Sequence, residues 1–234
     1  DVRAVNVTTT PEAARFDVHI TDRKTGAEKI FENMALSMLG EHNVQNALAA
    51  IAIAVEMDIG EDVIRRSRDS FEGVRRRFTR IDVVDAITII DDYGHHPVEI
   101  AAVLKTARAA TEGKVVAVVQ PHRYSRLEDL FEGFCTCFND ADAVVVADVF
   151  EAGEDPIEGI HRDALVDGLE RHGHRTVRAL EGPGGLAGMI DTLAAPGDMV
   201  VFLGAGDITR WANELPDQLR RLRAKGREAG NDAG

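Results

Sequence analysis

From about residue 80 onward, the chain alternates between short apolar runs and longer stretches with helical periodicity. The apolar runs predict strands, and the stretches between them predict helices. The expected strands are 87–90, 115–119, 143–149, 176–180 and 199–203, and the expected helices are 97–110, 125–138, 161–171, 184–194 and 207–225. This alternation predicts an α/β fold with a mostly parallel sheet, helices on both faces and right-handed crossovers. Residues 78–84 are expected to add an antiparallel edge strand.

The first part of the chain has a different rhythm, and the change falls near residues 75–80. Alternating polar and apolar residues predict strands of a partly exposed antiparallel sheet, followed by two helices. The expected strands are 4–7, 15–20 and 29–31, and the expected helices are 43–57 and 61–71. This part begins abruptly in a strand and has few helices to cover its sheet. It is therefore expected to be the end of a larger, mixed α/β domain.

Composition excludes several classes of protein. The 234 residues carry a net charge of −13, which argues against a general nucleic-acid surface and means that an anionic ligand needs a local basic pocket. No run of 18 apolar residues is present, so no membrane span is expected. Residues 1–10 lack the basic and apolar regions of a signal peptide, and the two cysteines fit a reducing compartment. These features predict a cytoplasmic protein.

A dense polar cluster follows the expected strand 87–90. The segment Asp91-Asp92-Tyr93-Gly94-His95-His96-Pro97 brings together two carboxylates, a phenol and two imidazoles. Pro97 suits the first turn of a helix, so the cluster is expected where a parallel strand ends and a helix begins. Ligands of open α/β sheets bind at that edge.

A basic cluster follows the next strand. His122, Arg123 and Arg126 lie within five residues, at the expected start of a helix. Because parallel strands end at the same edge of a sheet, this cluster is expected to face the one at 91–97. Guanidinium groups near a helix start favour a carboxylate or a phosphate. We therefore expect a site for an anionic group here, although a single such Arg is usually a surface residue.

Two other features have competing interpretations. His95 and His96 could bind a metal in a phosphoesterase, but neighbouring residues point in different directions and no H-x-x-x-H or H-E-x-x-H motif is present. Near residue 43, Asn43 can serve as the N-cap of the long helix. Asn46 lies three residues on, so His42, Asn43 and Asn46 could instead read the edge of a base.

Several motifs together resemble those of the Mur ligases, and the likeness spans nearly the whole chain. In order they are Gly40-x-His42-Asn43-x-x-Asn46-Ala47, Gly73-Val74-x-Arg76-Arg77-Phe78, Asp91-Asp92-Tyr93-Gly94-His95-His96-Pro97, Pro121-His122-Arg123-Tyr124-Ser125-Arg126, Asp148-Val149-x-x-Ala152-Gly153-Glu154 and Gly204-Ala205-Gly206-Asp207-Ile208. The resemblance implies an N-terminal domain for a UDP-sugar, a central ATPase domain and a Rossmann-like C-terminal domain. Residues 1–77 are then expected to be the C-terminal part of the central domain, and 78–234 the C-terminal domain. The family's P-loop motif is absent from this sequence, so the chain alone is expected to be inactive.

The resemblance also implies a reaction and roles for residues. The reaction joins L-alanine to the carboxylate of UDP-N-acetylmuramate through an acyl phosphate, with ATP and with Mg²⁺ whose main ligands lie upstream. By likeness, His42, Asn43 and Asn46 hold adenine, Asp92 holds the ribose and Arg77 reaches the phosphates. The residues implied for the alanine pocket are Tyr93, His95, His122, Arg123 and Arg126, with His95 orienting the amine or accepting its proton. No metal ligand is assigned within this chain.

Three alternatives remain open from the sequence. The parent protein could add another amino acid by the same chemistry. The chain could be a metal-dependent phosphoesterase built on the Asp and His cluster. It could also be a module that binds a nucleotide without catalysis.

Overall fold

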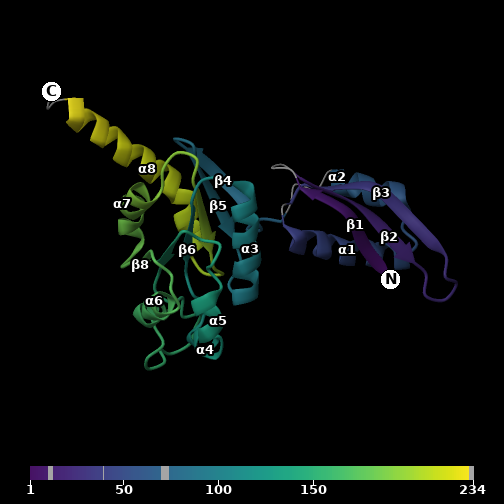
Figure 1. Ribbon diagram of the computed structural model, residues 1–234, viewed down its shortest axis with the longest axis horizontal. Helices are drawn as coiled ribbons and strands as arrows, with labels where there is room; N and C mark the ends of the chain where they lie inside the picture. The colour runs from purple at the N-terminus through teal and green to yellow at the C-terminus, as the bar shows by residue number, and fades with distance from the viewer. Residues whose placement is uncertain (10–12, 39, 70–73, 232–234) are drawn as a thin grey trace. The chain divides into compact units, whose positions relative to one another are not determined.

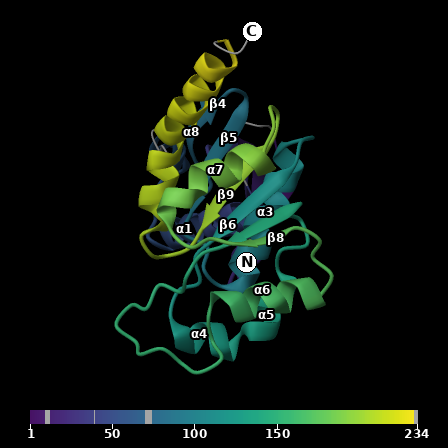
Figure 2. The same ribbon diagram turned by 90° about the vertical axis from the view of Figure 1, so that its left-hand side faces the viewer.

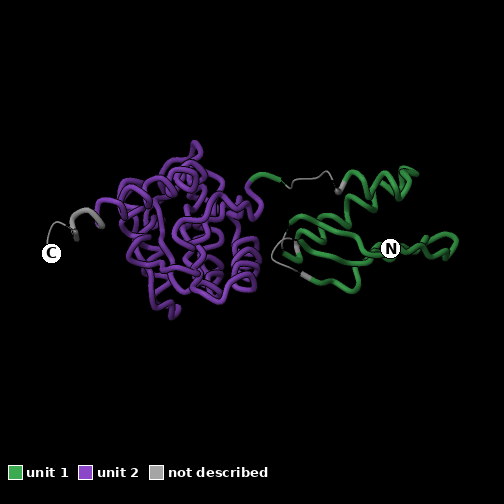
Figure 3. Tube along the Cα trace, turned by 90° about the horizontal axis from the view of Figure 1, so that it is seen from above, with its two compact units in different colours: residues 1–75 green, residues 76–234 purple. Residues whose placement is uncertain are grey.

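The computed structural model describes residues 1–9, 13–38, 40–69 and 74–231, and the chain divides into two compact units with a boundary between Arg75 and Arg76 (Figure 3). We call residues 1–75 unit 1 and residues 76–234 unit 2. Each unit has its own apolar core, so each is described separately.

Unit 1 is a three-stranded antiparallel sheet with two helices. Its elements are β1 (Val2–Thr9), β2 (Ala14–Thr21), β3 (Glu28–Leu36), α1 (Glu41–Glu56) and α2 (Glu61–Asp69), with strand order β1-β2-β3. Side chains along β2 alternate between buried and more exposed positions, as expected for a strand with one covered face. The helices supply Ile51 and Ile64 to a core that also contains Phe16, Phe31 and Met34.

Unit 2 contains a six-stranded sheet with helices on both faces (Figure 1). Its strands are β4 (Thr79–Val84), β5 (Ile87–Asp92), β6 (Val115–Val119), β7 (Ala143–Val146), β8 (Val177–Ala179) and β9 (Met199–Leu203). Its helices are α3 (Pro97–Ala110), α4 (Tyr124–Asp129), α5 (Phe131–Thr136), α6 (Arg162–Arg171), α7 (Pro183–Leu193) and α8 (Ile208–Asn231). The strand order is β4-β5-β9-β6-β7-β8, in which only the β4–β5 pair is antiparallel. The predicted α/β class and mostly parallel sheet are confirmed.

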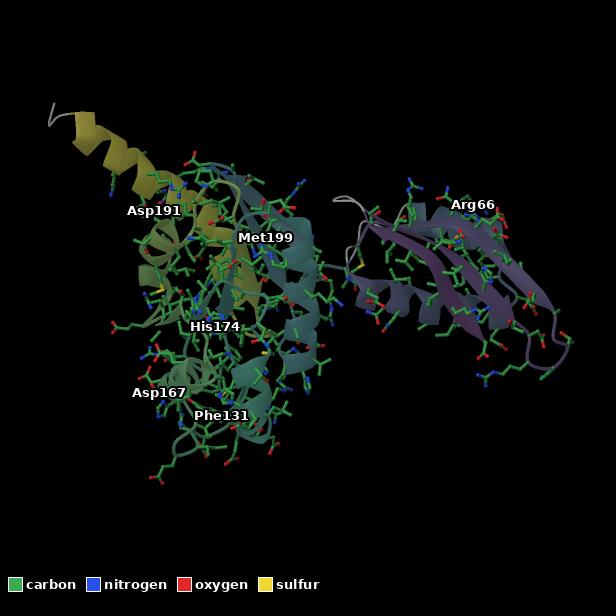
Figure 4. All side chains as sticks on the ribbon, viewed as in Figure 1. Arg66, Phe131, Asp167, His174, Asp191 and Met199 are labelled. Carbon is green, nitrogen blue, oxygen red and sulfur yellow. The ribbon has the colours of Figure 1, made fainter. Side chains whose placement is uncertain are left out.

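Both faces of the sheet are covered, which explains why its strands are apolar throughout. Every residue of β6, β7 and β9 is buried. One core lies under α3, α5 and α6, and α5 and α6 pack side by side (Figure 2). The other core lies under α7 and α8, which line the opposite face. Met199 marks the start of β9 among the packed side chains of Figure 4.

Two expected elements differ from the structure. The single helix predicted at 125–138 is two short helices, because Leu130, with φ −118° and ψ 20°, leaves the helical region between α4 and α5. Of the two interpretations of Asn43, that of a helix N-cap is wrong. Helix α1 begins at Glu41 with Gly40 as its N-cap, so Asn43 lies inside the first turn. Within the described residues, no helix is both long enough and apolar enough to cross a bilayer.

Candidate active site

The loops after β5, β6, β7 and β9 meet at one edge of the unit 2 sheet. Parallel pairing places the carboxyl ends of these strands together, as the alternation predicts. Contacts between the loops confirm this arrangement. An isolated parallel bridge joins His122 to Phe150, and the amide of Gly204 donates to the carbonyl of Asp92 at 3.3 Å. We call this edge, with its loops, the strand-end site.

The two aspartates that end β5 are buried, and their carboxylates hold the loop that follows. Asp92 is fully buried, and its two carboxylate oxygens accept hydrogen bonds from the amides of Phe78 and Gly94, each at 2.7 Å. Asp91 accepts a hydrogen bond from the Thr209 hydroxyl at 2.6 Å. The Asp92 carboxylate therefore ties the start of unit 2 to the loop that follows β5.

Burial of Asp92 shifts the pKa of its carboxyl group upward, and we predict that this shift can be measured. Burial raises the pKa of Asp92 from 3.8 to about 6, against the opposing effect of the Gly94 and Phe78 amides. Because the folded value is the higher one, the stabilising contribution of the protonated form is fully present below pH 3.8. It is lost as the pH rises through about 6, and its size is at most about 3 kcal/mol.

The measurement is a carbon NMR titration of the side-chain carboxyl groups. Asp92 is expected to titrate near pH 6. The internal reference is exposed Asp62, whose hydrogen bond with Arg66 lowers its pKa below 3.8. A midpoint for Asp92 at or below 4 would contradict the assigned burial.

Two arginines at the start of unit 2 approach Tyr93. The Arg76 guanidinium lies 4.7 Å from the centre of the Tyr93 ring, donates to the carbonyl of Gly204, and lies 3.6 Å from Asp91. Arg77 lies farther from that ring, at 5.8 Å, and 3.9 Å from Glu99. The motif quoted from the sequence contains both arginines but did not distinguish Arg76 as the one that contacts Gly204 and Asp91.

The two adjacent histidines have different roles. His96 is the N-cap of α3: its Nδ1 accepts a hydrogen bond from the Val98 amide at 3.3 Å, and Glu99 completes a capping box. His95 turns toward the strand-end site. Its ring lies 5.1 Å from that of Tyr93 and 5.8 Å from that of His122. The structure therefore brings together Tyr93, His95 and His122, as predicted, and assigns His96 to the helix.

His122 is held from two sides. The Phe150 ring stacks on the His122 ring at 5.3 Å with an interplanar angle of 15°. Arg126 Nη1 lies 3.0 Å from the His122 carbonyl oxygen and 3.2 Å from its Nδ1. Burial and the positive charge of Arg126 lower the pKa of His122, which favours the neutral ring.

Arg123 is bound within the protein by Glu154. Arg123 Nε donates to Glu154 Oε1 at 2.7 Å, and Ser125 donates to the same carboxylate through its hydroxyl and its amide. Hydrogen bonds from Ser125 and Arg123 lower the pKa of Glu154 to about 2. Arg123 has a positive φ of 75°, which is costly for a residue with a side chain. Glu154 thus fixes the loop that carries His122 and Arg126.

We expect Glu154→Gln to loosen this loop. The carboxylate now accepts hydrogen bonds from Arg123 and from Ser125. A glutamine side chain would replace one of its oxygens by an NH2 group, which cannot accept such a bond. Hydrogen exchange at the Ser125 amide should become faster, while exchange at Val118 in β6 should not change. Glu128→Gln, at an exposed position of α4, is the control and should leave Ser125 unaffected. Unchanged exchange at Ser125 in Glu154→Gln would rule out this role.

A cavity of about 540 Å³ adjoins the strand-end site on the side of β7 and β8. Its walls carry four carboxylates, those of Asp148, Glu151, Glu181 and Asp207. Such walls disfavour an anion. An anionic group at this edge is therefore better accommodated beside His122 and Arg126.

The residues of unit 1 that resemble an adenine site differ in their exposure to solvent. Asn43 is buried, whereas Asn46 is exposed on α1. The side chain of His42 lies outside the described part of the chain. Among the described residues, no cluster of three or more His, Cys, Asp or Glu side chains is arranged to hold a metal ion.

Phe150 and Glu154 are the site residues that sequence reasoning missed. Glu154 lies in one of the quoted motifs, and its position on the next strand-end loop could have suggested a partner for the basic cluster. No signal in the sequence marks Phe150, because its role depends on the ring of His122 lying parallel to it.

Comparisons with known proteins identify the family. Residues 76–206, more than half of the chain, match the family described as Mur ligase, glutamate ligase domain. A UDP-N-acetylmuramate–L-alanine ligase from Rhodospirillum centenum is 60% identical over 222 residues, which are 95% of this chain and 46% of that protein. Another, from Phenylobacterium zucineum, is 58% identical over 97% of this chain and 47% of its own length.

A solved structure gives the same result. The crystal structure of the UDP-N-acetylmuramate-alanine ligase from Thermotoga maritima superposes with a TM-score of 0.73 at 26% identity, over 94% of this chain and 46% of that one. The chain spans about half the length of the curated relatives it matches. On the family match and these likenesses, the chain belongs to the Mur ligase family.

Proposed function

We propose that this chain is the acceptor part of an ATP-dependent ligase that joins L-alanine to the carboxylate of UDP-N-acetylmuramate in peptidoglycan precursor synthesis. The observation that carries the proposal is the strand-end site, where two imidazoles and the Arg126 guanidinium lie together at the edge of an otherwise acidic protein. The relatives at 58–60% identity that are named as ligases for this substrate pair support it.

The site suits an α-amino acid because it offers groups for both ends of that ligand. The amine end needs a hydrogen-bond acceptor that can also take a proton, and we assign this role to His95. The carboxylate end needs donors and positive charge, which His122 and Arg126 offer. Tyr93 and Arg123 flank these groups, and we keep them in the proposed pocket.

The chemistry follows from the reaction class. When ATP is bound, phosphoryl transfer to the muramyl carboxylate would give an acyl phosphate. The free amine of alanine then attacks that carbonyl carbon, the new C–N bond forms, and phosphate leaves from a tetrahedral intermediate. The residues of this chain contribute by binding the amine in line with the acyl carbon and by removing its proton.

The residues that we associate with ATP form an incomplete site in this chain. Arg77 presents a half-buried guanidinium, and Asn46 is exposed. Asp92 and Asn43 are buried, and both carboxylate oxygens of Asp92 are already bound by amides. Because Asp92 is fully buried, a ribose could reach it only if the loop around it moved.

We also propose how the chain divides by function. Residues 1–77 would be the end of the central ATPase domain, and residues 78–234 the C-terminal ligase domain. The P-loop and the main Mg²⁺ ligands would then lie in a preceding part of the protein, and the chain alone would be inactive. A cytoplasmic location fits such a reaction, because its substrates are cytoplasmic precursors.

The test is substrate dependence in the full-length protein. Phosphate release is expected only when ATP, UDP-N-acetylmuramate and L-alanine are all present, and the product should be the alanyl conjugate by mass spectrometry. Release of phosphate from a simple phosphoester without ATP, abolished by a chelator, would instead indicate the phosphoesterase.

A further inference from the structure

Each of the two site histidines has one ring nitrogen committed to a protein group. For His122 this nitrogen is Nδ1, which lies 3.2 Å from Arg126 Nη1. For His95 it is also Nδ1, which lies 2.8 Å from the carbonyl oxygen of Tyr93. Within the described residues, neither Nε2 has a hydrogen-bond partner. The partner of His122 is a hydrogen-bond donor and the partner of His95 is an acceptor, so the two rings carry their protons on different nitrogens.

The partner of His122 can only donate. A guanidinium has five N–H groups and no acceptor, so Nδ1 of His122 must accept the hydrogen bond from Arg126. A neutral imidazole that accepts at Nδ1 carries its proton on Nε2. The second hydrogen of Arg126 Nη1 can bind the carbonyl oxygen of His122 at 3.0 Å. Stacking on Phe150 further restricts rotation of the ring.

The partner of His95 can only accept. A backbone carbonyl has no proton to give, so Nδ1 of His95 must donate to Tyr93. In the neutral ring, Nε2 of His95 then carries a free lone pair. Glu99 Oε2, 3.6 Å from Nδ1, adds negative charge on the same side of the ring.

The geometry points to two histidines fixed in opposite tautomers, so that His122 donates and His95 accepts a hydrogen bond at the two ends of one zwitterionic ligand. Arg126 is then a positioning residue that fixes the proton of His122. The identity of the ligand as an α-amino acid rests on the proposed function. Its carboxylate would accept from Nε2–H of His122, and its ammonium would donate to Nε2 of His95.

Amide formation releases two protons: His95 takes the first, and the second, lost when the C–N bond forms, leaves with the expelled phosphate. Transfer of one proton from the ammonium group to Nε2 of His95 leaves a neutral amine and an imidazolium. The imidazolium keeps its hydrogen bond to Tyr93, and the carboxylate of Glu99 lies 3.6 Å from its Nδ1. His122 does not take part in this transfer, since its Nδ1 lone pair is already used by Arg126.

The charged groups around His122 act mainly in one direction. Arg126, His95 and Arg123 disfavour a second proton on the ring, and only Glu154 favours it. The pKa of His122 is therefore lowered, by burial and by these charges, and the ring should take up a second proton at a lower pH than an ordinary histidine does. Removing the charge of Arg126 should raise the pKa of His122 and allow the neutral ring to adopt either tautomer.

The test is nitrogen NMR of the histidine side chains in this 234-residue chain, without substrate. We expect His122 as the Nε2–H tautomer and His95 as the Nδ1–H tautomer. His174, labelled in Figure 4, is an internal reference for the first form, since its Nε2 lies 3.0 Å from the carbonyl of Ala141. Detection of His122 as Nδ1–H, or of His95 as Nε2–H, would overturn the proposal.

Variants test the role of Arg126 separately. In Arg126→Met, His122 should lose its single tautomer and titrate at a higher pH, while the His174 signal stays in place. Arg126→Lys keeps a cation and should raise the pKa of His122 less than methionine does. A His122 signal that is the same in wild type and Arg126→Met, with His174 also unchanged, would remove Arg126 from this role. Because no substrate is present, the outcome does not depend on whether the parent protein uses alanine.

Discussion

Arg126→Met in the full-length protein is expected to raise the KM for L-alanine by about ten- to a hundredfold, the cost of a lost hydrogen bond to a charged group. The substitution removes the positive charge beside His122 and the donor that contacts its Nδ1 and carbonyl. The KM for ATP should change little, because the residue lies on the side of the site assigned to the amino acid. A steady-state phosphate-release assay with varied L-alanine measures the effect.

Two comparison variants make this result specific. Arg123→Met should raise the KM for L-alanine less than Arg126→Met, because the Arg123 guanidinium is already bound by Glu154. Arg171→Met is the neutral control, since Arg171 is exposed at the end of α6 that leads away from the strand-end site. A KM for L-alanine that is unaltered in Arg126→Met would exclude Arg126 from the pocket.

Gly206→Ala is expected to destabilise unit 2 by about 1–3 kcal/mol, the usual cost of overpacking a filled interior. A Cβ atom at Gly206 would lie 2.4 Å from Gln120 Oε1 and 2.6 Å from the Phe150 ring. Neither neighbour can move freely. Gln120 Oε1 accepts from the Ile208 amide, and Phe150 stacks on His122. Relief of the clash should therefore also disturb His122.

The matched substitution is Gly188→Ala in the exposed interior of α7. Nothing lies within 4 Å of a Cβ atom there, so alanine should stabilise the helix by up to about 1 kcal/mol. The two variants differ by the same methyl group and have opposite expected signs. Urea unfolding, followed by a probe in unit 2, gives both free energies. A Gly206→Ala protein as stable as wild type would contradict the packing described.

The positions of the strands in unit 2 could be predicted from the sequence, because the strands of a parallel sheet covered on both faces are continuous apolar runs. The runs at 87–90, 115–119 and 199–203 fall within or coincide with β5, β6 and β9. Because parallel strands end at the same edge of a sheet, the loops after β5 and β6 were expected to meet, and His95 does approach His122 although β9 lies between the two strands. Local chemistry gave the start of α3, where Pro97 occupies its first turn.

Other features depend on side-chain contacts that no local pattern encodes. The binding of Arg123 by Glu154 joins residues 31 positions apart in the chain. The tautomer of His122 depends on which of its two ring nitrogens faces the Arg126 guanidinium. The burial of Asn43 and the exposure of Asn46 reflect the first turn of α1, which begins two residues earlier than the predicted cap. The functional roles of these residues remain predictions.

The most direct measurement of the proposed acceptor site is a histidine NMR spectrum of the full-length protein. The protein is saturated with UDP-N-acetylmuramate and a non-hydrolysable ATP analogue, and L-alanine is then added. We predict that the Nε2 signals of His95 and His122 shift in a saturable way, while the signal of His174 stays fixed. If L-alanine supports ligation with ATP in the phosphate-release assay but leaves the His95 and His122 signals unmoved in this spectrum, the amino acid binds elsewhere and the proposed strand-end site is wrong.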